Sequence, residues 1–147
     1  MGYTLQAFIG EQAVLEKLAF ENAKVIALTD RVSLVPMIGE LYDEINQLQA
    51  SPSIDGILFL NENVEREILK RVGYDKIAYI TADYAGGIGG QCGVVWQNGE
   101  REMVQPFGPG VINEILRQFG VVGTGSRDEF EVTGLNRFRS TEDWLEE

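Results

Sequence analysis

Residues 76–107 read KIAYITADYAGGIGGQCGVVWQNGEREMVQPF, and this stretch decides the fold. Its first nine residues are mostly apolar and of strand-forming types, and glycine then fills four of the five positions 86–90. The chain resumes as a strand that ends at Asn98-Gly99, a dipeptide typical of a type I′ turn because both central residues of that turn need a positive φ. The stretch therefore predicts three strands joined by two hairpin turns.

The glycine segment admits two interpretations besides a nucleotide site. Phosphate-binding loops connect a strand to the N-terminus of a helix. Here the glycines lead into another strand, and no Gly-Lys-Ser/Thr sequence follows, so nucleotide binding is disfavoured. A wide hairpin, in which glycine supplies positive φ or a bulge, is favoured. In the second interpretation the bare backbone of Gly86, Gly87 and Gly89 lets a partner approach closely, with Asp83, Tyr84 and Gln91 beside it.

The rest of the chain predicts helices and strands in a mixed order. Asn61 is a plausible N-cap, and Glu62 and Glu65 fall in the first turn, where the helix dipole favours them. Apolar residues at three- and four-residue spacing predict helices, and short apolar runs predict strands. The predicted helices are 11–20, 37–49, 61–72 and 109–119, and the predicted strands outside the central stretch are 3–9, 24–28, 32–35 and 57–60.

These elements predict an α+β fold with an antiparallel or mixed sheet and about four helices packed mainly on one face. The chain of 147 residues fits a single domain, residues 1–147. Residues 121–147 are expected to dock onto it as a C-terminal tail that ends in a short turn carrying Trp144. Arg137 and Arg139, the basic cluster of this tail, are expected to pair with its own Asp128, Glu129 or Glu142, or to clamp an acidic partner.

Charge and composition limit the classes of partner. The formal net charge of −11 disfavours binding to nucleic acids and to anionic membrane surfaces, since both attract basic proteins. It favours a basic protein partner. No apolar run approaches the length of about 20 residues that a membrane span needs, and the lone Cys92 cannot form an internal disulfide. A cytoplasmic location is expected.

The chain contains no histidine. Its absence excludes Ser-His-Asp and Cys-His catalysis and histidine-ligated metals. Alternation along its strand places Cys92 with Val94 and Trp96, so an inert, buried thiol is expected. The carboxylate pairs lack calcium-loop spacing. No catalytic residue, metal or cofactor is predicted.

Three segments resemble a group of small acidic bacterial proteins of uncharacterised function: DYAGGIGGQCGVVWQNG (83–99), GPGVINEILRQFGV (108–121), and a tail that begins with DEF (128–130) and ends with GLNRFRSTEDWL (134–145). The resemblance implies an acidic-aromatic-Gly-Gly-x-Gly-x-Gln hairpin and a closing DEF...GLxRxRxTxDW tail. Ala85 departs from it, because an aromatic residue is expected there. The resemblance implies no activity.

Three functional hypotheses follow. The first is a non-enzymatic protein-interaction domain, of the inhibitor or immunity-protein kind, that covers a basic surface on another protein. The alternative is a small-molecule-binding domain or an unrecognised enzyme, with a pocket between the glycine hairpin and the C-terminal tail lined by Asp83, Tyr84, Gln91, Arg137 and Arg139. A third hypothesis, self-association into a homo-oligomer, rests on an exposed hairpin edge.

Overall fold

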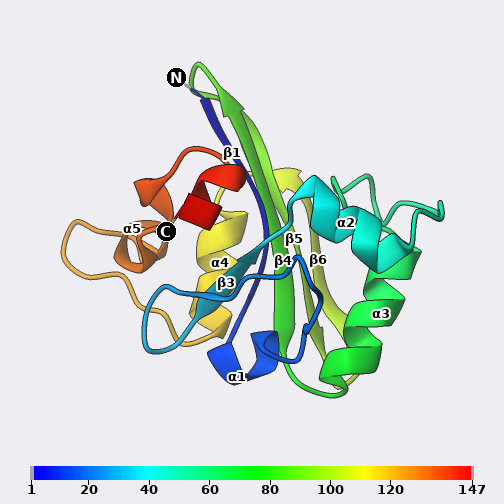
Figure 1. Ribbon diagram of the computed structural model, residues 1–147. Coiled ribbons are helices and arrows are strands. Elements are labelled where there is room, and N and C mark those ends of the chain that lie inside the picture. Colours follow the sequence, from blue (N-terminus) through cyan, green and yellow to red (C-terminus); the bar gives the residue numbers. More distant parts are fainter. Residues whose placement is uncertain (1, 147) are drawn as a thin grey trace.

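The computed structural model describes residues 2–146, and these residues form one antiparallel sheet of six strands in the order β2-β3-β1-β4-β5-β6 (Figure 1). The long strands β1, β4 and β5 form its centre, and β6 is a long edge strand. The strands are β1 Gly2–Gly10, β2 Ile26–Ala27, β3 Ser33–Pro36, β4 Ile77–Ala85, β5 Ile88–Gln97 and β6 Glu100–Gly108.

Helices cover both faces of this sheet (Figure 1). The first three lie on one face, over a core that includes Phe8, Tyr79 and Trp96. The others lie on the opposite face, over Leu5, Ile80 and Val95. The α-helices are α1 Gln12–Leu15, α2 Gly39–Asn46, α3 Glu62–Val72, α4 Val111–Gln118 and α5 Glu129–Thr133, and the 3-10 helices are η1 Leu135–Arg137 and η2 Glu142–Glu146.

The α+β class and the three strands of the central stretch are confirmed. Asn98 and Gly99 have φ angles of 57° and 77°, as the predicted turn requires. Asn61 caps α3, because its side chain accepts a hydrogen bond of 2.9 Å from the Val64 amide. The sequence predicts helices mainly on one face of the sheet, whereas both faces carry helices. The cause is that β4 and β5 carry apolar side chains on both faces of the sheet, so each face must be covered by helices.

Two predicted elements are wrong. The helix predicted over residues 11–20 is a single turn, α1, followed by turns and irregular chain. The strand predicted over residues 57–60 is irregular chain. Ile54, Ile57 and Leu60 are buried there, so this apolar run anchors a loop rather than pairing in the sheet.

The C-terminal segment completes the sheet beside β1. The backbone amide of Thr4 donates a hydrogen bond of 2.8 Å to the Arg139 carbonyl. The Gln6 amide donates one of 3.0 Å to the Thr141 hydroxyl. Trp144 on η2 is fully buried against the face that carries α4. Within residues 2–146, no helix has the length and apolarity needed to cross a membrane.

Candidate functional site

The outer part of the β4–β5 hairpin projects beyond the helices (Figure 1). Its tip is a two-residue turn, Gly86-Gly87, between the paired residues Ala85 and Ile88. The two glycines have φ angles of 60° and 81°, which residues with a side chain rarely adopt. A Cβ atom on Gly89 would lie 1.8 Å from the carbonyl oxygen of Asp83. The predicted glycines therefore shape a tight turn and a close strand pairing.

Strand alternation separates the other residues predicted on this hairpin. Asp83 pairs with Gly90 and faces the side of the sheet that carries α1–α3, whereas Tyr84 pairs with Gly89 and faces the side that carries α4 and α5. Gln91 lies on the same side as Tyr84. The structure thus forms two sites, one on each face, rather than a single shared one.

We call the site on the Asp83 side the hairpin groove. Its volume is about 300 Å³, and Cys92, which is partly exposed and not buried as expected, is one of its lining residues. Phe107 of β6 is 65% exposed, and its ring lies over Gly90, where a Cβ atom would be only 2.6 Å from the ring. Ile88, on the same face of β5, is 82% exposed. The groove is lined by Gln6, Gly56, Leu58, Thr81, Ala82, Asp83, Gly90, Cys92 and Phe107.

The loop between α2 and α3 supplies the opposite wall of the groove. Leu58 is 53% exposed, although its carbonyl accepts a hydrogen bond of 2.8 Å from the buried Tyr79 hydroxyl. Next to it, Phe59 has a φ of 57° and packs against the Tyr42 ring at 5.0 Å between centroids. A positive φ at a bulky residue is strained and requires support from its surroundings. The loop is therefore fixed, and its exposed leucine is preorganised.

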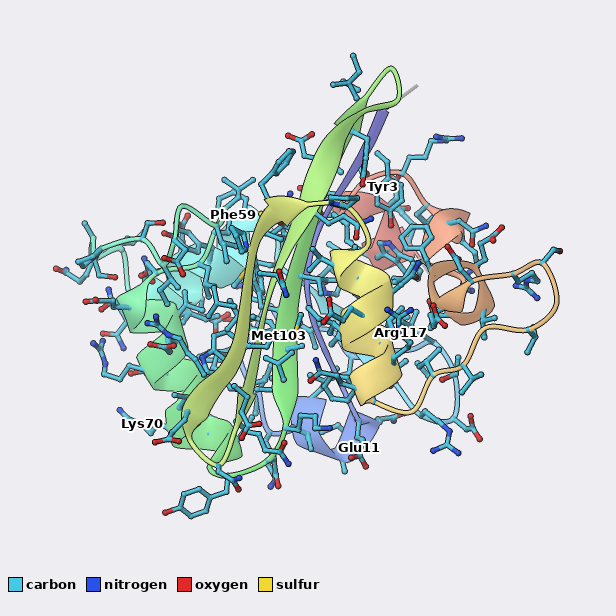
Figure 2. The ribbon with its side chains drawn as sticks, turned by 180° about the vertical axis from the view of Figure 1, so that it is seen from behind. Tyr3, Glu11, Phe59, Lys70, Met103 and Arg117 are labelled. Atoms are coloured by element: carbon cyan, nitrogen blue, oxygen red, sulfur yellow. The ribbon has the colours of Figure 1, made fainter. Side chains whose placement is uncertain are left out.

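We call the site on the other face the aromatic pocket. Its volume is about 250 Å³, and it lies between the hairpin and the tail, where the alternative hypothesis expects a pocket. Figure 2 shows Tyr3 and Phe59 on opposite sides of the sheet, which is the separation between the pocket and the groove. The pocket is lined by Tyr3, Ala82, Tyr84, Gln91, Asn113, Asp128 and Phe130.

Hydrogen bonds fix the polar wall of this pocket. The Gln91 side-chain carbonyl accepts from the Ile112 amide at 2.8 Å, near the start of α4. Asn113 donates to Asp128 at 3.1 Å and accepts from the Phe130 amide at 2.8 Å. Asp128 also forms a capping box with Glu131 at the start of α5. The pattern Asp128-x-x-Glu131 is typical of a helix start and could have revealed α5 in the sequence.

The two predicted arginines lie away from both sites. The Arg137 guanidinium lies 5.1 Å from the centroid of the Trp144 ring, and its Nε donates to the Gly134 carbonyl at 3.3 Å. Arg139 contributes its backbone carbonyl to the pairing with Thr4. Glu129, one of the expected internal partners, pairs with Arg117 at 3.1 Å instead. Ring stacking and backbone pairing therefore hold the tail at these positions.

Glu65 and Tyr3 are among the ionisable groups whose pKa values are shifted. The hydrogen bonds from Arg101 lower the pKa of Glu65, against the effect of partial burial, and the Trp96 indole reinforces this shift. Burial raises the pKa of Tyr3 well above its usual range, so its hydroxyl stays protonated and donates to the Leu135 carbonyl at 2.8 Å. Over the described residues, no group of three or more His, Cys, Asp or Glu side chains could hold a metal ion.

No protein-family model, curated protein or solved structure matches the chain. The resemblance to small acidic bacterial proteins stays a prediction.

Proposed function

We propose that this protein is a non-enzymatic interaction domain that binds a basic protein through the hairpin groove. The observation that carries the proposal is the exposure of Phe107 and Leu58, at 65% and 53%, which line the groove beside the projecting hairpin. Ile88, which is 82% exposed, lies at the tip of the hairpin on the same face of the sheet. Large apolar side chains gathered at an exposed surface are typical of protein-binding sites. Aromatic side chains are also enriched among the residues that dominate binding energy.

The charge of the chain supports a basic partner. With 23 acidic and 12 basic residues, the protein attracts cationic surfaces at long range and speeds their encounter. Asp83 lies in the groove itself, next to the apolar side chains. A partner that inserts an apolar side chain beside Phe107 and surrounds it with lysine or arginine would match both features.

The test is a comparison of two charge-adding variants. Ile88→Asp combined with Phe107→Asp removes the exposed apolar side chains at the hairpin tip and in the groove. Val122→Asp is the control, because Val122 is 71% exposed and borders a different cavity. Each variant, with the wild type, is used to purify crosslinked partners from cells of the source species, with quantitative mass spectrometry. We expect one basic protein that the wild type and Val122→Asp retain and that the double variant loses by at least about tenfold, or about 1.4 kcal/mol.

A second measurement uses the purified partner. Its dissociation constant should rise steeply between about 50 and 200 mM salt, because screening weakens long-range attraction. If the double variant captures the same proteins as the wild type at equal yield, or if the captured partner is acidic and binds independently of salt, the proposal is wrong.

A further inference from the structure

The aromatic pocket contains three rings. Tyr3 and Phe130 meet edge to face, with 5.5 Å between their centroids and an interplanar angle of 62°. Tyr84 is the direct neighbour of Tyr3 across the β1–β4 pairing and lies on the same face. The face of an aromatic ring carries partial negative charge and attracts cations. A pocket with three such rings therefore provides a surface on which an organic cation is stabilised without losing apolar contact.

A carboxylate completes the pocket. Both carboxylate oxygens of Asp128 accept hydrogen bonds, one of 2.9 Å from the Glu131 backbone amide and one of 3.1 Å from the Asn113 side chain. Within the described part of the chain, no lysine or arginine pairs with Asp128. Each carboxylate oxygen can accept more than one hydrogen bond. The pocket thus holds a fixed negative charge that has acceptor capacity left and no cation of its own.

The start of α4 disfavours a cation in the pocket, because the N-terminus of a helix carries a partial positive charge of about half an elementary charge. Its Ile112 amide is already bonded to Gln91. Asp128 contributes a full negative charge, and the net charge of the chain is −11. The second helix that begins at the pocket, α5, is capped by Asp128 itself. The balance of charge at the pocket therefore favours a cation.

We infer that the aromatic pocket binds an alkylammonium group, with the cation against the faces of Tyr3, Tyr84 and Phe130 and its charge balanced by Asp128. The same chemistry is presented by a free amine and by the end of a lysine side chain. The site lies on the face of the sheet opposite the hairpin groove and does not depend on the partner proposed for that groove.

The first experiment is an NMR titration of the full-length, ¹⁵N-labelled protein with tetramethylammonium chloride. Sodium chloride at the same ionic strength is the reference, because a chain of this charge attracts any cation weakly. We expect saturable shifts of the Tyr84, Gln91 and Asn113 amides beyond those that sodium produces. Shifts equal to those from sodium, or spread evenly over the acidic surface, would overturn the inference.

Variants locate the interaction. Asp128→Asn removes the charge and keeps a residue that caps helices well, and Tyr84→Leu removes one ring. Each should weaken binding by about tenfold, which lies within the range of cation–π and charge contributions. Asp43→Asn, on the exposed side of α2 and on the other face, is the matched control and should bind as the wild type does. Equal affinity of the wild type and Asp128→Asn contradicts the assignment.

Two further titrants distinguish the sources of the cation. Butylammonium chloride represents a free amine, and N-acetyl-lysine-methylamide represents a lysine in a protein. Tighter binding of the first identifies a small-molecule ligand, and tighter binding of the second identifies a lysine side chain. Both outcomes support the site. If neither titrant binds saturably, and tetramethylammonium does not either, the inference is refuted. The groove variant Ile88→Asp/Phe107→Asp should bind these cations normally, so failure of one proposal is separable from failure of the other.

Discussion

The inner and outer halves of the β4–β5 hairpin use the same two strands in different surroundings. In the inner half, residues 77–82 and 93–96 are buried, with helices over both faces. In the outer half, residues 83–91 are largely exposed, and glycine fills four of these nine positions. Burial of apolar surface stabilises a fold in proportion to area, so the inner half accounts for stability and the outer half does not. The outer half instead forms the walls of two sites, one on each face.

The largest difference between the halves should appear when an aromatic ring is removed from each. Trp96 is fully buried in the inner half, whereas Phe107 is 65% exposed beside the outer half. Trp96→Ala should lower the free energy of unfolding by about 3–5 kcal/mol. Phe107→Ala should change it by about 0.5 kcal/mol or less. Urea denaturation followed by circular dichroism measures both, and equal losses would contradict the division of the hairpin.

A smaller effect concerns the ion pair that ties α3 to the inner half. Glu65 accepts from the Trp96 indole at 2.7 Å and from Arg101 Nη2 at 2.9 Å. Glu65→Gln should cost about 1.5–3 kcal/mol at pH 7, as is typical of hydrogen bonds to charged groups. The measurement is the free energy of unfolding across a pH series.

The pH dependence of that cost has a definite sign. Because the folded state lowers the pKa of Glu65, its contribution is present above the pKa of the unfolded chain and is lost as the pH falls through the folded pKa. The gap between the wild type and Glu65→Gln should therefore close under acidic conditions. A gap that stays constant down to about pH 2, below the usual pKa of a glutamate, would show that the carboxylate charge contributes nothing.

Two neighbouring glycines test the geometry of the outer half. A Cβ atom on Gly89 would collide with the backbone of Asp83, whereas one on Gly90 would meet only the outer atoms of the Phe107 ring. Gly89→Ala should lower the free energy of unfolding by more than about 1 kcal/mol, because the backbone cannot adapt. Gly90→Ala should cost less than Gly89→Ala, since the exposed ring can rotate away. The same denaturation assay decides between them, and the reverse order would contradict the pairing described.

The smallest expected effect is at the tip. Ile88→Asp should leave the melting temperature close to that of the wild type, because an exposed side chain contributes within about 0.5 kcal/mol. Differential scanning calorimetry measures this. A large loss of stability would mean that Ile88 is packed against another part of the molecule or against a second copy.

Local signals predict two features that border the inner half. Asn98-Gly99 predicts the turn between β5 and β6, and Asn61 predicts the start of α3, because both depend on neighbouring residues only. The apolar run at residues 57–60 predicts a strand but forms an anchored loop, because an apolar run alone does not distinguish the two. Side chains alternate between the two faces of a sheet along each strand, which places Cys92 and Trp96 on the same face. The same alternation places Asp83 and Tyr84, which are adjacent in β4, on opposite faces.

The residues that line the aromatic pocket cannot be predicted from local sequence patterns. Its walls come from β1, β4, β5, α4 and the start of α5, and Tyr3 lies more than a hundred residues from Phe130 in the chain. No local pattern encodes such a meeting. The sequence places Arg137 and Arg139 at a pocket between the hairpin and the tail, whereas in the structure ring stacking and backbone pairing occupy them.

The pairing of residues 139–141 with residues 4–6 has a consequence for synthesis. Hydrogen bonds between residues 135 positions apart form only after residue 141 has left the ribosome, so the edge of β1 at residues 4–6 stays open until then. Unpaired strand edges promote aggregation of incomplete chains. A chaperone that shields β1 during translation should therefore raise the yield of the protein more than one that acts on the finished chain.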